Sequence, residues 1–167
     1  MNQKYRNYIM WALYALLFLL VMLVQTTVFG RVRFNGVKLY LMPVVLVCIA
    51  MGVGHEAGGL FGLIAAVVWF AAGADDGVLA MVSFTLMGIL AGYLCDAVFS
   101  RRFLPAFFLT LGALVCHESA VFLLKYYLEG ASGELIRWVP VTAGLSVLAC
   151  PAVYLAAKAI RKVGGRY

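Results

Sequence analysis

The stretch Gly52–Ile64, GVGHEAGGLFGLI, joins two apolar segments with almost no loop between them. Only His55 and Glu56 are polar at this join. In a helix, residues spaced four apart lie on one face, and three glycines here have that spacing: Gly54, Gly58 and Gly62. In a membrane, a face of glycines lets the backbone of a neighbouring helix come close. The stretch predicts a short helical hairpin around which the rest of the chain packs.

The composition around this stretch is that of an integral membrane protein. The chain has 167 residues, of which 65% are hydrophobic and 12% charged, and its mean hydropathy is +1.01. Soluble domains are about half apolar and about a quarter charged. The apolar excess lies in long uncharged runs, and the length suits one integral membrane domain over 1–167.

Six apolar runs predict an all-α fold, a compact bundle of six transmembrane helices. We place the spans at about 9–29, 38–54, 57–74, 77–96, 103–128 and 138–158. A helix needs about 20 residues to cross the hydrocarbon, so the second and third runs are short. They either cross with help from flanking residues or enter and return as a re-entrant hairpin. Pro151 lies inside the last run and predicts a kink there.

The positive charge is distributed as a membrane topology signal. The net charge of +6 comes from Lys and Arg at the ends of the apolar runs, which argues against a nucleic-acid partner and suits lipid headgroups. More of these cations fall on the side of both termini, so the positive-inside rule predicts cytoplasmic termini. The run Ile9–Phe29 is too long for a typical signal peptide and is interpreted as a retained span.

Glu118 and His117 are the ionisable residues that the sequence places at depth. Glu118 lies about 15 residues into the fifth span, about 22 Å from its start. A charge there is costly unless it is paired, protonated or hydrated. Glu118 and His117 therefore have two readings: a ligand contact or proton relay, or a polar clasp to another helix.

The sequence predicts neither an enzyme nor a bound metal or cofactor. Both His-Glu pairs lack the second histidine of a zinc-protease motif, since Gly59 and Val121 occupy those positions. His55 and Glu56 are interpreted as turn residues, and Asp76 as the N-cap of the fourth span. Four cysteines lie in apolar runs without CxxC spacing and are expected to be buried: Cys48, Cys95, Cys116 and Cys150.

Small residues supply the candidate packing faces. The third span carries Gly54, Gly58 and Gly62, and the fourth carries Gly88 and Gly92. Such spacing is typical of close helix packing. These glycines are also the candidate docking surface for a partner helix.

Several of these features together resemble the bacterial rod-shape-determining MreD family. The resemblance spans most of the chain and rests on seven segments: Val24–Gln25, Pro43–Ala50, Gly54–Ile64, Asp75–Gly77, Gly88–Gly92, Arg101–Arg102 and Glu118. Two positions depart from the family pattern. The third span has no acidic residue before Asp75, and Val44 stands where many members carry Asp after the proline.

The resemblance implies a non-enzymatic scaffold of the cell-elongation complex in the bacterial cytoplasmic membrane. The implied partners are a bitopic MreC-like protein, the actin-like MreB and the peptidoglycan synthases. The family's fold is similar to that of the substrate-binding S component of energy-coupling-factor transporters. An S component is thus the alternative, although the AxxxA docking motifs expected in its first span are missing from Trp11–Phe18. A different small permease or an intramembrane enzyme is the third reading.

Overall fold

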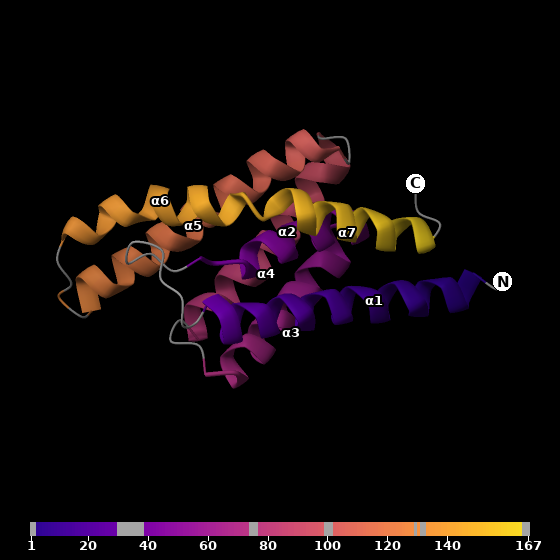
Figure 1. The fold of residues 1–167 in the computed structure, drawn as a ribbon, viewed down its shortest axis with the longest axis horizontal. Coiled ribbons are helices and arrows are strands. Elements are labelled where there is room, and N and C mark those ends of the chain that lie inside the picture. The colour runs from indigo at the N-terminus through magenta and orange to yellow at the C-terminus, as the bar shows by residue number, and fades with distance from the viewer. Residues whose placement is uncertain are drawn as a thin grey trace.

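The computed structural model describes residues 3–29, 39–73, 77–98, 102–128, 130 and 133–164, and all regular structure in these ranges is helical. The helices are α1 (Gln3–Val24), the π-helix η1 (Gln25–Phe29), α2 (Met42–Val53), α3 (His55–Ala71), α4 (Gly77–Ala97), α5 (Phe103–Leu128), the 3₁₀ helix η2 (Gly133–Arg137), α6 (Trp138–Val147) and α7 (Cys150–Val163). Figure 1 shows the first turn of α1 and the last turn of α7 at the same end of the molecule.

Three of the described helical segments are long and apolar enough to cross a membrane. They are Tyr5–Phe29, Val78–Ala97 and Phe103–Leu128, and the bent pair α6–α7 makes a fourth if it counts as one span. The described part of the chain is therefore all-helical, with three or four helical segments that suit a membrane-embedded protein. Helix length does not support all six predicted spans, because α2 has only 12 residues and α3 only 17.

The last span is broken near its proline, as predicted. Pro151 has no backbone N–H to donate to the preceding turn of helix. The helix is interrupted at Leu148–Ala149, and the axes of α6 and α7 differ by 45°. The kink confirms the expectation drawn from Pro151.

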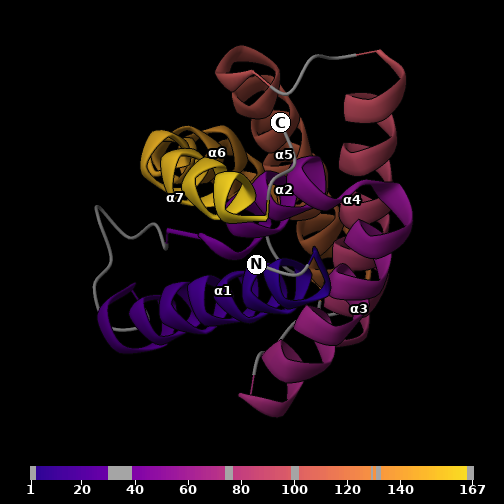
Figure 2. The ribbon, with the colours of Figure 1, turned by 90° about the vertical axis from the view of Figure 1, so that its right-hand side faces the viewer.

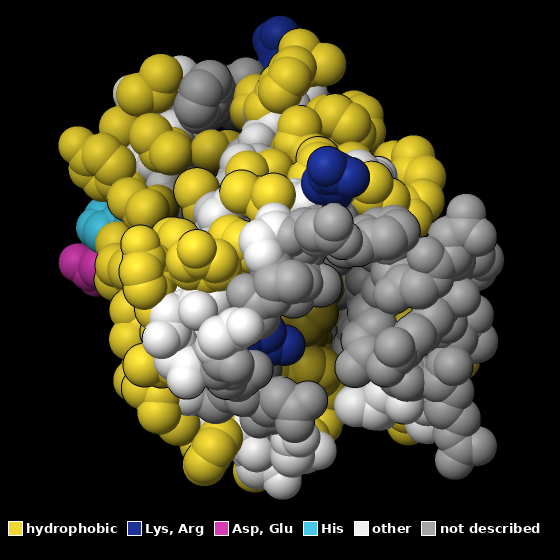
Figure 3. Space-filling model, turned by 90° about the vertical axis from the view of Figure 1, so that its left-hand side faces the viewer, with side chains coloured by type: hydrophobic (Ala, Val, Ile, Leu, Met, Phe, Trp, Pro, Cys, Tyr) yellow, Lys and Arg dark blue, Asp and Glu magenta, His cyan; other side chains and the backbone are white. Residues whose placement is uncertain are grey.

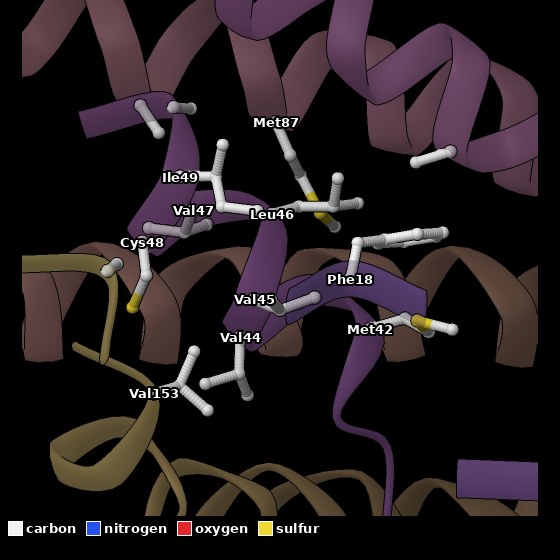
Figure 4. Packing of buried hydrophobic residues seen from close by; sticks show 14 of the residues in the cluster. Phe18, Met42, Val44, Val45, Leu46, Val47, Cys48, Ile49, Met87 and Val153 are labelled. Carbon is white, nitrogen blue, oxygen red and sulfur yellow. The ribbon is translucent and has the colours of Figure 1, made fainter. Parts of the chain in front are cut away.

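The short helix α2 lies in the middle of the bundle. Figure 2 shows it surrounded by the longer helices, and every residue from Met42 to Val53 is buried. Figure 4 shows side chains from other helices closing on it, among them Phe18 of α1, Met87 of α4 and Val153 of α7. A helix that is apolar on all sides is stable only when it is enclosed. At about 1.5 Å per residue α2 is about 18 Å long, so its enclosure by protein replaces contact with lipid.

Two residues set the ends of α2. Pro43 lies in its first turn, where the missing N–H is one that has no helical partner anyway. Gly54 ends it with φ 93°, a conformation that strains other residues, while its N–H still donates to the Ala50 carbonyl at 2.9 Å. Helix α3 begins at the next residue, His55. The predicted tight join between the second and third helices is thus a single glycine.

The outside of the bundle is covered by large apolar side chains. Figure 3 views one end of the molecule, where many of the coloured side chains are hydrophobic and few are Lys or Arg. Side chains more than half exposed occur on several helices, among them Leu16, Leu20, Leu23, Leu60, Ile64, Phe70, Val82, Leu90, Phe108 and Leu155. A soluble monomer rarely exposes apolar surface on this scale, so this surface suits a lipid environment.

Some sequence predictions fall beyond the described ranges. The acidic turn at Asp75–Asp76, with the proposed cap at Asp76, lies outside them, as does Arg101. The predicted polar loop from Glu129 to Arg137 is described in part, and its last five residues form η2.

Candidate functional site

The candidate site is a polar clasp around the non-helical segment Leu39–Leu41, which leads into α2. Gln25, the first residue of η1, is buried beside this segment. Its amide nitrogen Nε2 donates to the Leu39 carbonyl at 2.7 Å, and its Oε1 accepts from the Leu41 N–H at 2.8 Å. Non-helical backbone at membrane depth is stable only where protein or water satisfies its polar groups. Gln25 does this for two backbone groups at once.

Tyr40, between those two residues, is held from three sides. Its backbone N–H donates to Ser146 Oγ of α6 at 2.8 Å. Its ring stacks on the His117 imidazole with 5.0 Å between centroids and 8° between planes. The indole of Trp69 meets the same ring edge-on at 6.0 Å. Tyr40 thus ties α3, α5 and α6 to the start of α2.

His117 is the polar centre of this clasp. It is only 2% exposed, on α5. Its Nδ1 lies 2.9 Å from Ser83 Oγ of α4, and Phe84 lies on its other side with 5.6 Å between ring centroids. One imidazole therefore joins α4, α5 and Tyr40 through a hydrogen bond and two ring contacts. These contacts are those expected if His117 holds neighbouring helices together, which is the second of the two interpretations given for it.

Glu118 follows His117 but does not share its position. Its side chain is half-buried, whereas His117 is enclosed. Successive helix residues are about 100° apart, so the two side chains leave α5 in different directions. The structure brings His117, Ser83 and Tyr40 together, and Glu118 is the next residue on α5.

The predicted glycine faces meet each other inside the chain. A Cβ added to Gly58 of α3 would lie 2.7 Å from the Gly88 carbonyl oxygen, and one added to Gly88 would strike the Gly58 backbone. Farther along, a Cβ on Gly62 would collide with the Phe84 backbone, and one on Gly92 with that of His55. These glycines let α3 and α4 pack backbone against backbone. The seam is therefore filled by the chain itself, in the close helix packing that the glycine spacing predicts.

The join at Gly54 carries a polar contact that the sequence did not reveal. His55 Nδ1 lies 3.7 Å from the Asp96 carboxylate, and the His55 ring meets Tyr93 edge-on at 6.3 Å. Both side chains are well exposed, so solvent weakens any electrostatic attraction between them. Glu56, the neighbour of His55, is exposed on the first turn of α3. His55 and Glu56 were interpreted as turn residues, but they are the first two residues of α3, and Gly54 alone makes the turn.

Three of the four cysteines are buried and one is not. Cys150 Sγ lies 3.7 Å from Thr110 Oγ1, and Cys95 Sγ lies 3.8 Å from the Met51 carbonyl oxygen. Cys48 is buried on α2. Cys116 is exposed on α5, contrary to the prediction that all four are buried. An apolar run does not reveal which side of a helix faces outward.

Within the described ranges, no group of three or more His, Cys, Asp and Glu side chains is placed to hold a metal ion.

Comparison with known proteins gave no match to a family model, to a curated protein or to a solved structure. Function therefore has to be argued from the residues and the geometry described above.

Proposed function

We propose that this chain is a non-enzymatic membrane scaffold of the bacterial cell-elongation complex and belongs to the rod-shape-determining MreD family. Its partner would be a bitopic MreC-like protein, with MreB and peptidoglycan synthases in the same assembly. The proposal begins with the sequence resemblance. The structure adds support through the roles of the residues that carry that resemblance.

The observation that carries the proposal is that four of the seven motif segments hold the described part of the fold together. Gln25 clasps the segment before α2. Pro43–Ala50 forms most of the enclosed central helix. The glycines of Gly54–Ile64 and Gly88–Gly92 form the α3–α4 seam. A pattern that coincides with the structural supports of the fold is more informative than scattered identities. It favours a shared architecture, and with it a shared role in packing and binding.

Buried polar groups with structural partners support the same role. Gln25, Ser146 and His117 each bind another part of the chain. These contacts rigidify the bundle around α2, and a rigid bundle presents a fixed outer surface to other membrane proteins. Because α3 and α4 occupy their own glycine seam, the partner's helix has to bind elsewhere on the outer surface.

The topology is part of the proposal. We infer six membrane passes in the bacterial cytoplasmic membrane, with both termini in the cytoplasm. The second and third passes correspond to α2 and α3, and α2 is shielded from lipid by its neighbours. Two full passes and a re-entrant α2–α3 hairpin both return the chain to the same side of the membrane. The predicted orientation of the termini is therefore the same in both cases.

Affinity purification from native membranes tests this function. The full chain would carry a C-terminal tag at its native expression level, and membranes would be cross-linked before solubilisation. We expect quantitative mass spectrometry to show enrichment of a bitopic MreC-like protein together with MreB and a peptidoglycan synthase. An unrelated tagged polytopic protein at matched level is the control for non-specific capture.

Two results would contradict the proposal. One is enrichment of a transporter ATPase pair with its transmembrane coupling subunit, which would identify an S component. The other is a tightly bound small molecule in the purified chain that is lost in Glu118→Ala while the variant remains folded. Either result would indicate that the chain is part of a transporter and not a scaffold.

A further inference from the structure

A cationic surface lies where α1, α7 and the start of α5 meet. On α7, Lys158, Arg161 and Lys162 are spaced three and four residues apart, so they lie on one side of the helix. Lys158 and Lys162 are exposed, and Arg161 is half-buried. Like charges at this spacing repel each other on a helix. The arrangement therefore costs stability unless an anion accompanies it.

Contacts between the helices fix this surface in the fold. Arg6 of α1 donates from Nε to the Val163 carbonyl at 3.2 Å, which ties the first turns of α1 to the last turn of α7. Deeper in the same interface, the Tyr14 hydroxyl lies 3.5 Å from the Ala157 carbonyl oxygen. On the other flank, the ring of Phe103 packs against Tyr154 with 5.5 Å between centroids. Arg102, exposed and next to Phe103, thus lies close to α7.

Among the described residues of α1 and α7, no carboxylate balances this charge. Neither α1 nor α7 contains an Asp or Glu residue. Among the residues that the structure describes, a close contact joins His55 and Asp96, and none joins a carboxylate to Lys158, Arg161 or Lys162. The surface therefore presents a net positive charge from three helices.

Aromatic side chains beside the cations indicate a membrane interface. Tyr5 and Tyr8, on the first turns of α1, are 68% and 75% exposed. Tyrosine is enriched where hydrocarbon meets headgroups, because its ring is apolar and its hydroxyl polar. Leu155, one turn before Lys158, is also exposed and supplies an apolar contact on α7. On α7 the apolar Leu155 comes before the cations. A phospholipid has the same arrangement, with acyl chains on one side and the phosphate on the other.

We propose that this surface, formed by Arg6, Arg102, Lys158, Arg161 and Lys162, binds the phosphate headgroups of anionic phospholipids. Basic surfaces between transmembrane helices are suited to such headgroups, because the attraction acts within a Debye length of the membrane. A bound anionic headgroup relieves the repulsion between Lys158 and Lys162 and joins α1, α5 and α7 around one anion. The lipid is thereby a structural ligand of the bundle. The inference requires membrane embedding and does not depend on the proposed function.

Native mass spectrometry of the detergent-purified full chain tests this proposal, with phosphatidylglycerol and phosphatidylcholine as probes. We expect saturable binding of phosphatidylglycerol that is tighter than binding of phosphatidylcholine. Each Lys or Arg near the surface changes affinity by about fivefold. The triple variant Lys158→Gln/Arg161→Gln/Lys162→Gln should therefore bind phosphatidylglycerol on the order of a hundredfold more weakly.

Two matched variants separate a site from general charge and from misfolding. Lys125→Gln/Arg137→Gln removes two exposed cations elsewhere on the chain and should leave phosphatidylglycerol binding unchanged. Lys158→Arg/Lys162→Arg keeps the charge and should also keep binding. Equal binding of the two lipids would overturn the proposal, as would equal losses in the triple variant and the Lys125/Arg137 variant. Displacement of the lipid by millimolar inorganic phosphate would likewise overturn it, because the site would then recognise free phosphate.

Discussion

At the scale of single residues, the start of α2 depends on side chains that replace missing backbone partners. Gln25 binds the carbonyl of Leu39 and the N–H of Leu41, and Ser146 accepts the N–H of Tyr40. The Leu39 carbonyl and the N–H groups of Tyr40 and Leu41 precede the helix and have no helical partner, so these side chains satisfy them. The side chains let non-helical backbone exist within a buried region of a membrane protein.

Replacing Gln25 with leucine should destabilise the fold strongly. The variant keeps the size of the side chain but leaves two backbone groups without their partner, each at a cost of about 1–3 kcal/mol. We expect the thermal midpoint in detergent to fall by about 5–15 °C. Thr27→Val is the control, because the Thr27 hydroxyl is exposed and bonds only within its own helix, to the Leu23 carbonyl. An unchanged midpoint in Gln25→Leu would show that the clasp contributes nothing.

His117 should contribute both through its ring and through its nitrogen. His117→Ala removes the stack with Tyr40 and leaves a cavity, so we expect a loss of about 2–4 kcal/mol in unfolding free energy. His117→Phe keeps a ring and should lose less. A double-mutant cycle with Ser83→Ala should give a coupling of about 0.6–1.7 kcal/mol, the range for hydrogen bonds between membrane helices. Additive effects in that cycle would contradict a direct Ser83–His117 bond.

At the scale of elements, glycine spacing organises the α3–α4 pair and proline breaks α6–α7. The spacing of Gly58, Gly62, Gly88 and Gly92 predicts close packing from sequence, because only helices with bare faces bring their backbones together. Sequence does not say which helix fills the face. The spacing was compatible with an external partner, and the structure shows that the chain fills the face itself.

Enlarging a glycine in this seam should separate α3 from α4. Gly58→Leu places a side chain where the Gly88 carbonyl lies, so we expect misfolding or a large loss of thermal stability. Gly112→Leu is the matched control, because a Cβ at Gly112 on α5 would meet nothing within 4 Å. Stability after purification, measured by size-exclusion chromatography and thermal unfolding, compares the two. Equal behaviour of the variants would contradict the tight seam.

At the scale of the whole molecule, the sequence predicts the class of fold better than it predicts the polar contacts around the start of α2. The apolar runs, the tight join at Gly54 and the kink at Pro151 follow from local chemistry, and the structure shows each of them. The roles of Gln25 and Ser146 in the clasp were missed, because each bonds backbone groups of the segment before α2, and no local sequence pattern marks those groups. Likewise, His55 and Asp96 come together only when α3 folds back on α4.

Topology is the first property of the whole chain to measure. In a cysteine-free background, single cysteines at Asn35, Ser132 and the C-terminus would be labelled with a membrane-impermeant maleimide in intact cells. We expect labelling at Asn35 and Ser132 from outside, and at the C-terminus only after the membrane is permeabilised. External labelling of the C-terminus would contradict cytoplasmic termini.

The proposed scaffold role is tested most directly by cell width during depletion of the chain in the bacterium that encodes it. We predict that rod-shaped cells widen and round up as the protein is lost, and that wild type and Gly112→Leu both restore width whereas Gly58→Leu does not. Cells that keep their width through depletion, with or without a loss of micronutrient uptake, would contradict a role in cell elongation.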